Sequence, residues 1–299
     1  MGSKILVSGL INIEANVSVG CFPIEYTPID YLFGGIDVCL AGVGYNVSMG
    51  LKALGNDVAL VSIVGKDEIA EYVYRDLAMH GIEASHIKPW LEKTCASVIC
   101  FDEQGKRKIY CDLKNVQEIV MPYADTRDLA ASCDGLVIAN VNFNDELIRN
   151  ARELGKPIFS DVQVLNDVHD PFNKRFMENA DVLFLSSERV PMDRKEFMKA
   201  IWNEYHNKLI IMGCGKEGAI MYDGKSFHAA ASCEPRPVVN TVGAGDAMFS
   251  CFVHSYLKGL DPVTCLDRAV VFASYKVGES GGGKGFLDEE SLERLLAEL

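Results

Sequence analysis

Long apolar runs are missing from this sequence. No stretch approaches the ~18 consecutive apolar residues that a membrane-spanning helix requires, and the chain enters a strand-like segment, Lys4–Ser8, almost at its start. That leaves no room for the charged and apolar regions of a secretory signal peptide. We therefore expect a protein of the cytoplasm that has no membrane partner.

Positive charge is scarce as well. The 299 residues include 29 Lys and Arg against 42 Asp and Glu, which gives a formal net charge of −13. Proteins that bind nucleic acids need clustered Lys and Arg to contact the phosphate backbone. We expect no nucleic-acid partner, although a local site for a small anionic ligand is compatible with this charge.

Two common site motifs are absent. None of the ten cysteines forms a CxxC pair, and most lie in apolar stretches, so we expect reduced thiols of the core rather than zinc ligands. The GxxxxGK[ST] motif of P-loop proteins is also missing. What is present is a composition, 48% hydrophobic and 24% charged, that is ordinary for a globular protein.

Helix and strand signals alternate along most of the chain. Short apolar runs predict strands, and apolar residues at helical spacing, often ended by a glycine, predict helices. The order predicts an α/β fold with a doubly wound, mostly parallel sheet and helices on both faces. The predicted strands are Lys4–Ser8, Val58–Val64, Gly135–Asn140, Pro157–Asp161, Asp181–Leu185 and Lys208–Met212; the predicted helices are Gly44–Leu54, Asp67–His80, Asp145–Leu154 and Arg194–Tyr205.

Two segments, about 14–41 and 94–112, break this alternation. The first holds short β-prone pieces between glycines and prolines, and in the second a turn at Asp102–Gly105 separates Thr94–Phe101 from Arg107–Asp112. We expect both segments to form a small antiparallel sheet that acts as a lid and excludes water from a site. The whole chain, 1–299, is then a single domain with this lid.

The most informative stretch is Asn240–Ser250. A strand-like piece, Pro237–Val239, precedes it, and apolar residues at helical spacing follow it, so Gly243-Ala244-Gly245-Asp246 opens a helix. The glycines let the backbone approach a ligand, and the free N–H groups of the first turn point outward. Together with the helix dipole, these groups predict an anion-binding site.

Asp246 lies in the first turn of this predicted helix, and two interpretations are open. The carboxylate is either a base that accepts the proton of an attacking hydroxyl during phosphoryl transfer, or a cap of the helix N-terminus. A second glycine-rich stretch, Gly213–Gly218, fits GxGxxG, but the residues from Ala219 onward predict a strand instead of the helix of a dinucleotide-binding motif. It is typical of a turn over a nucleotide or of a plain β-turn.

These residues resemble the ribokinase-like (PfkB) carbohydrate kinase family over nearly the whole chain. Thr241–Asp246 is similar to that family's TxGAGD motif, and the N-terminal signature is similar to Gly42–Val47, Leu51–Gly55 and Val64–Asp67. The resemblance implies a doubly wound domain with a β-sheet lid. It also implies ATP, Mg²⁺ and phosphorylation of a hydroxymethyl group on a sugar or nucleoside.

The resemblance assigns roles to particular residues. Asp246 would be the catalytic base, and the anion hole would consist of the amides of Gly243, Ala244 and Gly245. The nucleotide contacts would be Ser187, Gly213, Gly215, Lys216, Gly218 and Thr241. The acceptor contacts would be Asn12 and Glu14, expected to close the first strand on one face, with Gly42, Asn46 and Asn142.

Several positions depart from the family pattern. Glu14 stands where a shorter carboxylate is common. Asn240 replaces an Asp that supports a monovalent-cation site in relatives that use one, so activation by K⁺ is in doubt. The NxxE motif linked to Mg²⁺ matches poorly at Ser186–Arg189, which leaves Glu188 as the candidate metal residue.

Alternatives to a sugar kinase remain at this point. One alternative is a nucleoside kinase acting on an adenosine-, inosine- or pseudouridine-like acceptor. It is favoured if the lid aromatics stack on a base, whereas the other interpretation is that they pack within the lid: Phe22, Tyr26, Tyr31 and Phe33. A phosphosugar acceptor would need basic lid residues, of which Lys106, Arg107 and Lys108 are the candidates. A non-catalytic nucleotide or sugar sensor is a third possibility. Because lid sheets have exposed edges, we expect a homodimer through the lid.

Overall fold

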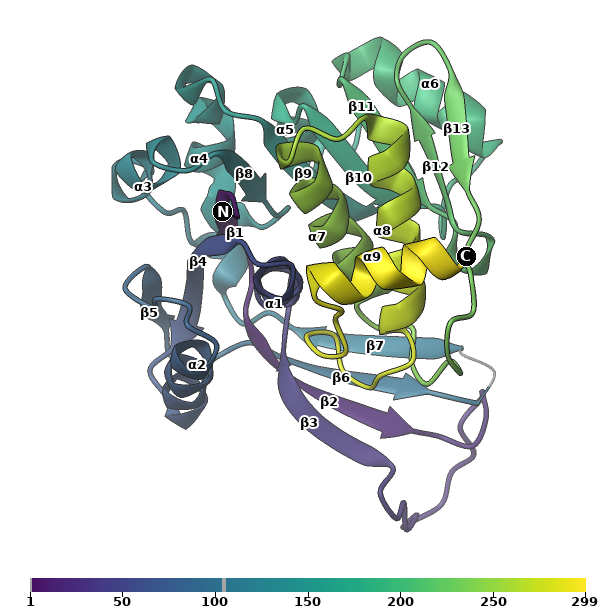
Figure 1. Ribbon diagram of the computed structural model, residues 1–299. Helices are drawn as coiled ribbons and strands as arrows, with labels where there is room; N and C mark the ends of the chain where they lie inside the picture. Colours follow the sequence, from purple (N-terminus) through teal and green to yellow (C-terminus); the bar gives the residue numbers. More distant parts are fainter. Residues whose placement is uncertain (1, 104–105) are drawn as a thin grey trace.

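A sheet of nine strands forms the centre of the structure, a computed structural model that describes residues 2–103 and 106–299 (Figure 1). Its strands are β1 Lys4–Ser8, β4 Asp57–Gly65, β5 Ile87–Leu91, β8 Gly135–Ile138, β9 Ile158–Val164, β10 Val182–Ser186, β11 Leu209–Gly213, β12 Ala219–Tyr222 and β13 Phe227–Ala230. The order is β13-β12-β11-β10-β9-β8-β1-β4-β5. Neighbours run parallel, except that β12 is antiparallel to both β11 and β13.

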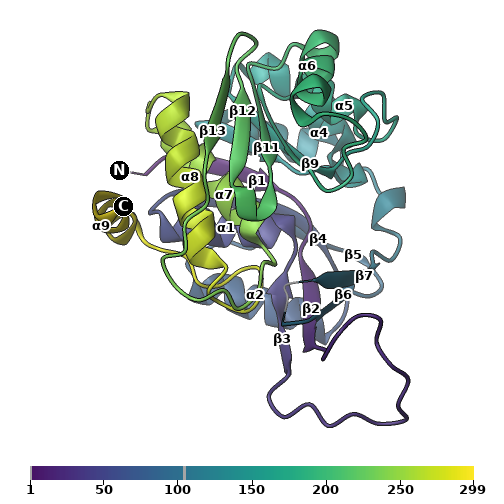
Figure 2. The same cartoon turned by 90° about the vertical axis from the view of Figure 1, so that its right-hand side faces the viewer.

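Helices cover both faces of this sheet. One face carries α1 Val43–Ala53, α2 Glu68–Met79, α7 Ala244–Leu257, α8 Pro262–Lys276 and α9 Glu289–Glu298; the other carries α3 Arg127–Ala131, α4 Asp145–Asn150, α5 Lys174–Asn179 and α6 Arg194–Tyr205. Figure 2 shows α7 and α8 on one side of the strands and α4, α5 and α6 on the other. Short 3₁₀ helices lie at η1 Val116–Glu118, η2 Tyr123–Asp125, η3 Asn142–Asn144, η4 Ala151–Leu154 and η5 Gly215–Glu217.

Two hydrophobic cores hold these layers together. In β1, Ile5 and Val7 pack into the core beneath α1, α7 and α8, whereas Leu6 packs into the core beneath α3 to α6. A strand buried on both faces appears in sequence as a continuous apolar run, which is why Lys4–Ser8 was predictable. No helix in the described part of the chain is long and apolar enough to cross a membrane.

The second sheet is the lid sheet, formed by β2 Asn12–Ser18, β3 Ile36–Ala41, β6 Ala96–Phe101 and β7 Arg107–Asp112 in the order β3-β2-β6-β7. It lies below the large sheet in Figure 1. The β2–β3 and β6–β7 pairs are antiparallel, but β2 and β6 are parallel. They follow β1 and β5, which are themselves parallel strands, so both enter the lid in the same direction.

The predicted fold class is confirmed, and the expectation of a purely antiparallel lid is wrong in the β2–β6 pair. A second correction concerns Asn12 and Glu14. The first strand ends at Ser8, and both residues belong to β2 of the lid sheet. The expected turn residues Gln104 and Gly105 lie outside the described residues.

The two faces of the lid sheet differ in polarity. Along β2 the buried residues are Asn12, Glu14 and Asn16, which share one face because strand side chains alternate. The opposite face is apolar and exposed: Val38, Val98 and Tyr110 lie in register and are 57%, 41% and 53% exposed. The lid therefore turns its polar face toward the large domain.

One predicted strand is absent and several elements were not predicted. Residues 237–239 form no strand, since Pro235 and Pro237 lack the N–H groups that a ladder needs, and Val238 and Val239 are exposed. The missed elements include the edge strands β5 and β13. Each contains exposed or half-buried residues, so neither forms the continuous apolar run that predicts a buried strand. Helix boundaries agree more closely: Asp67 caps α2, as expected, by accepting from the N–H of Ala70 at 3.1 Å.

Candidate active site

The glycine-rich motif lies at the N-terminus of α7. Gly243 is the N-cap residue with a φ of +75°, and a Cβ added there would lie 2.6 Å from the carbonyl oxygen of Gly282. Both the backbone angle and the close approach therefore require glycine. The N–H groups of the first turn have no acceptor within the helix; that of Ala244 makes a long bond of 3.3 Å to the Thr241 carbonyl. With the helix dipole, these N–H groups make a suitable anion site.

Asp246 lies inside the first turn of α7, and Gly243 occupies the cap position. The carboxylate Oδ2 of Asp246 accepts a hydrogen bond of 2.7 Å from Nδ2 of Asn46. Of the two interpretations that the sequence left open, helix capping is therefore wrong. The bond joins α1 to α7, so it brings together residues of the two family-like motifs that lie 200 positions apart.

Burial raises the pKa of Asp246 above its ordinary value. The hydrogen bond from Asn46 and the positive charges of Lys276 and Arg107 act in the opposite direction. A carboxylate with a raised pKa accepts a proton more readily than an ordinary one, which is the property that a general base needs.

The polar face of the lid forms the opposite side of the site. Nδ2 of Asn12 donates to Oγ of Ser97 at 2.8 Å, and that hydroxyl in turn donates to Glu14 at 3.4 Å. Asn16 donates to the other Glu14 oxygen at 3.1 Å. Burial raises the pKa of Glu14, and the negative charge of Asp246 raises it further, while these two hydrogen bonds lower it. Glu14 is thus a buried carboxylate held in one orientation.

Two side-chain oxygens at this site are buried without a hydrogen-bond partner among the described residues: Oδ1 of Asn12 and Oδ1 of Asn46. Gly42 lies beside the first of them, since its φ is +98° and an added Cβ would approach Asn12 Oδ1 to 2.9 Å. Unpaired buried acceptors are costly unless a ligand supplies the donor. They suit the hydroxyl groups of a bound molecule.

The second glycine-rich stretch lies at the end of β11. Gly213 ends that strand, Gly215–Glu217 form the 3₁₀ turn η5, and β12 begins directly after Gly218, as the sequence predicted. The carbonyl of Gly213 also accepts from the N–H of Ser187 at 2.9 Å, which joins the two predicted nucleotide segments. Lys216 is exposed on the turn. A strand after the glycines excludes the helix that a dinucleotide-binding motif requires.

Arg107 of β7 connects the lid to Thr241, before α7, and to Glu188, after β10. Its guanidinium donates to Thr241 Oγ1 at 3.0 Å and to the Thr241 carbonyl at 3.2 Å, and it pairs with Glu188 at 3.2 Å. Arg107 thus lies against the glycine motif. The sequence alone had predicted either a contact for a phosphosugar or a solvated turn residue.

A family model described as pfkB family carbohydrate kinase matches residues 4–289. The chain belongs to this family. The prediction made from Thr241–Asp246 and Gly42–Val47 is confirmed, and so is the class of reaction, because pfkB-family kinases are phosphotransferases that use an alcohol group as acceptor. Use of ATP follows from the same membership.

Several individual kinases are similar to this pfkB-family kinase along their whole length. It is 24% identical over 326 residues to 5-dehydro-2-deoxygluconokinase of Clostridium beijerinckii, covering 94% of this chain and 92% of the relative. It is 22% identical over 296 residues to acarbose 7(IV)-phosphotransferase of Actinoplanes sp., covering 98% of each. The solved structure of a microbiome-derived acarbose kinase matches with a TM-score of 0.88 at 23% identity and 99% coverage of both chains. At this identity the structural likeness establishes the fold.

One buried carboxylate whose charge interacts with Asp246 was not singled out by sequence reasoning, that of Asp161. It lies in β9, and burial raises the pKa of its carboxyl to about 7. The N–H of Gln163 lowers that pKa through a 2.7 Å bond, whereas the charge of Asp246 raises it. Its signal was its place at the carboxyl end of the predicted strand Pro157–Asp161, near the sheet edge where ligands of open α/β sheets bind, although β9 itself continues to Val164.

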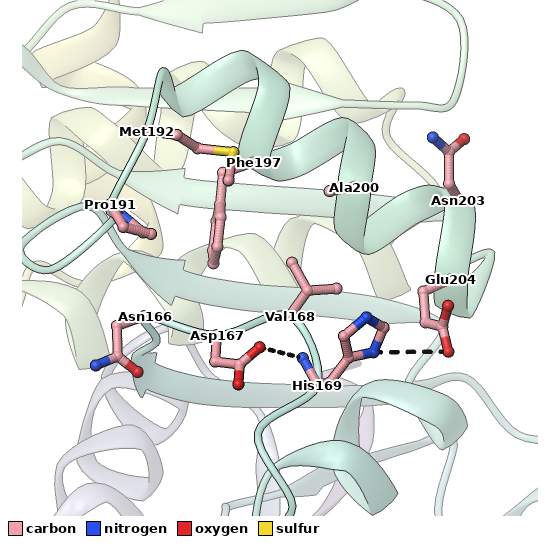
Figure 3. A pocket seen from close by; sticks show the side chains of 10 residues that line it. All are labelled: Asn166, Asp167, Val168, His169, Pro191, Met192, Phe197, Ala200, Asn203 and Glu204. Atoms are coloured by element: carbon pink, nitrogen blue, oxygen red, sulfur yellow. Dashed lines mark hydrogen bonds and ion pairs between the residues drawn. The ribbon is translucent and has the colours of Figure 1, made fainter.

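Asn142 has contacts outside this cluster. Its side chain donates to the carbonyl of Ile119 at 3.4 Å and accepts from Arg175 at 3.0 Å. A cavity of about 320 Å³, shown in Figure 3, is also separate: it lies between the segment after β9 and one side of α6, and no predicted site residue lines it. Side chains there include His169 and Glu204, whose nitrogen and oxygen lie 3.9 Å apart. Neither feature contributes to the arrangement around Asp246.

The residues near Asp246 fit Mg²⁺ that arrives with a nucleotide. Within residues 2–103 and 106–299 no group of three or more His, Cys, Asp or Glu side chains forms a metal cage. Mg²⁺ in kinase sites uses one or two carboxylates together with substrate phosphates. Asp161 and Asp246, whose charges interact, supply such carboxylates, whereas Glu188 is exposed and paired with Arg107.

Proposed function

We propose that this pfkB-family kinase transfers the γ-phosphoryl group of ATP to a hydroxymethyl group of a sugar or sugar derivative, with Asp246 as the base. The observation that carries the proposal is the 2.7 Å hydrogen bond between Asn46 and Asp246 at the start of α7. It holds a carboxylate with a raised pKa beside an anion site and opposite the polar face of the lid. Direct in-line transfer depends on positioning and charge stabilisation of this kind.

In the reaction, the acceptor hydroxyl gives its proton to Asp246 while its oxygen bonds to the γ-phosphorus, and the bond to the bridging oxygen breaks to leave ADP. The amides of Gly243, Ala244 and Gly245 stabilise the charge of the transferring group. Mg²⁺ bound with the triphosphate would neutralise further charge, and the buried carboxylate of Asp161 would hold it from the protein side. The nucleotide contacts are proposed to be Ser187, Gly213, Gly215, Lys216, Gly218 and Thr241.

The acceptor is proposed to lie between the lid and α1. Side-chain oxygens that accept hydrogen bonds come from Asn12, Glu14 and Asn46, and the backbone at Gly42 confines the space beside them. This arrangement suits a substrate with neighbouring hydroxyl groups. The relatives described above are named for a deoxygluconate and for acarbose, both sugar derivatives. Asn142 is proposed as an outer contact of an acceptor that extends beyond the cluster around Asp246.

The nucleoside alternative rested on the lid aromatics and on the exchange at Glu14; of the aromatics, Phe22 is half-buried and the other three are exposed. Tyr26, Tyr31 and Phe33 are 91%, 77% and 96% exposed in the connection between β2 and β3, which extends away from the domain in Figure 2. Exposed rings of this kind neither pack within the lid nor enclose a base. This arrangement favours a sugar acceptor over a nucleoside.

The lid and its outer face belong to the same proposal. We propose that the chain acts as one domain, 1–299, in the cytoplasm, and that the lid segments at about 14–41 and 94–112 close over the acceptor. The exposed apolar side chains of Val38, Val98 and Tyr110 support a homodimer through this face.

The decisive experiment is a screen for acceptor-dependent ADP release with Mg²⁺. The panel contains sugars, ketodeoxy sugar acids, oligosaccharides, phosphosugars and nucleosides, with Asp246→Asn as the background. We expect turnover with a sugar derivative, and mass spectrometry of the product identifies the phosphorylated group. Turnover with nucleosides alone would support the alternative kinase, and ATP binding without turnover on any acceptor would support a non-catalytic sensor.

A further inference from the structure

The ammonium group of Lys276 is buried beside the proposed base. Lys276 is the last residue of α8, and its side chain is 0% exposed. Its Nζ donates to the carbonyl oxygens of Gly281 at 2.7 Å and of Glu279 at 3.3 Å. A buried charge is costly unless it is paired and hydrogen-bonded, so the position of this lysine requires an explanation.

Acidic groups from three elements surround Lys276. Asp246 of α7, Glu14 of the lid sheet and Glu279 of the following loop favour its charged form, whereas burial and the charge of Arg236 disfavour it. Burial is the largest of these effects and lowers the pKa of Lys276 to about 8. The ammonium form therefore predominates at neutral pH, and its charge in turn lowers the pKa values of Asp246 and Glu14.

The loop that Lys276 holds forms a wall of the anion site. Gly281, whose carbonyl accepts from Lys276, precedes Gly282. A Cβ on Gly282 would lie 2.5 Å from Nδ2 of Asn46, the atom that donates to Asp246, and the Gly282 carbonyl crowds Gly243 at the start of α7. The loop cannot shift toward α7 without displacing the partner of the base. The ammonium is thus linked to Asp246 through three consecutive contacts: Lys276 with Gly281, Gly282 with Asn46, and Asn46 with Asp246.

We propose that Lys276 is a positioning residue that acts as an internal cation: its ammonium fixes the 279–283 loop against the start of α7 and takes the place of a dissociable monovalent cation. This inference rests on the proposed function, because it assigns a role at the same site. Turnover is then independent of K⁺ and depends on the charge of Lys276.

The residues near Asn240 do not fit K⁺. The Asn240 N–H donates to the Val277 carbonyl at 3.0 Å, which sets this residue beside the end of α8. Its side chain is an uncharged amide that already accepts from Val242 at 2.9 Å and donates to Asn16 at 3.4 Å. Asn240 therefore offers a cation no carboxylate, and the positive charge that the nearby Asp246 and Glu14 interact with is already supplied by Lys276.

Chemical rescue tests the proposal. The full-length protein, Lys276→Ala and Lys276→Gln are assayed with the acceptor found in the screen, in choline chloride, KCl and NH₄Cl at equal ionic strength. We expect wild-type kcat to be the same in all three salts. In choline chloride, kcat of Lys276→Ala falls about 10²-fold because the wall of the site shifts, and NH₄⁺ recovers a large part of the loss by entering the truncated position.

Thermal unfolding supplies a readout that does not require turnover. NH₄⁺ should raise the Tm of Lys276→Ala but leave that of the wild type unchanged, because a cation that binds only the folded variant stabilises it. The matched control is Lys284→Ala. Lys284 directly follows this loop but is 54% exposed and 3.8 Å from Asp37, so its variant should behave as the wild type in every salt.

Three results would overturn the inference. The first is a wild-type enzyme that KCl activates strongly over choline chloride. The second is a normal kcat for Lys276→Ala in choline chloride. The third is a loss of kcat and Tm that no small cation restores, which would leave Lys276 with a packing role alone. If Lys276→Ala does not fold, Lys276→Gln is measured by the same two readouts. Failure of Lys276→Gln to fold in NH₄Cl counts as this third result. A wild type that turns over no acceptor would instead contradict the proposed function, while the Tm comparison still reports on the cation position.

Discussion

The two sides of the candidate site are built from different chemical groups. On the side of the large domain, the backbone N–H groups of α7 and the carboxylate of Asp246 face the site. On the side of the lid, the groups are side-chain amides, hydroxyls and a carboxylate, from Asn12, Glu14 and Ser97. Backbone groups suit a phosphate whatever the acceptor is, whereas side chains distinguish one pattern of hydroxyls from another. We therefore expect the domain side to govern kcat and the lid side to govern selectivity.

The sharpest test of this division is Asp246→Asn on the domain side. The amide keeps the size of the side chain but cannot accept the proton of the acceptor, so we expect kcat to fall by about 10²–10⁴-fold. ATP binding should persist, because the amides of Gly243, Ala244 and Gly245 remain. Steady-state kinetics and calorimetric titration of ATP measure the two effects.

A helix-cap aspartate provides the matched control for that substitution. Asp193 caps α6 by accepting from the N–H groups of Lys195 and Glu196. Asp193→Asn should lower stability by about 1 kcal/mol or less without changing kcat. If Asp246→Asn behaved in the same way, with near-normal turnover, the assignment of Asp246 as the base would be lost.

On the lid side, Glu14→Gln should act on the acceptor. A hydrogen bond to a charged group contributes about 1.5–3 kcal/mol, so we expect the acceptor KM to rise by roughly ten- to a hundredfold. The KM for ATP should stay close to that of the wild type, and Glu25→Gln, on the exposed connection of the lid, should change neither constant. Equal increases in both KM values would place Glu14 outside the acceptor site.

The domain side of the site was largely predictable from sequence, and the reason is physical. A helix N-terminus is specified by residues that are neighbours in sequence, so Gly243–Asp246 alone predicts an anion site without any knowledge of tertiary contacts. The turn at Gly213–Gly218 followed by β12 is local in the same sense. Asn46 was identified only through the family resemblance, and its bond to Asp246 spans 200 positions.

Residues whose role depends on tertiary packing could not be recognised in the same way. Lys276 ends an apolar helix and looks like an ordinary basic residue of a last turn, yet it is fully buried. Arg107 follows a polar turn and was expected either at a phosphosugar or in solvent, whereas the register of the lid sheet sets it on the inner face. The parallel pairing of β2 with β6 likewise follows from the order of strands in the large sheet.

The smallest expected effect concerns Arg107, the residue that bridges the two sides. Its pair with Glu188 is partly exposed, with side chains 32% and 60% exposed, and such pairs contribute about 1 kcal/mol or less. We expect Arg107→Met to lower kcat/KM for ATP about threefold, and added salt to bring the wild type toward the variant because exposed charges are screened. Lys108→Met, which alters the neighbouring residue on the opposite face of β7 beside Tyr110, should have no effect. A hundredfold loss of kcat/KM for ATP would mean that Arg107 contacts the transferring phosphoryl group itself. Residues of both the lid and the large domain would then stabilise the transition state.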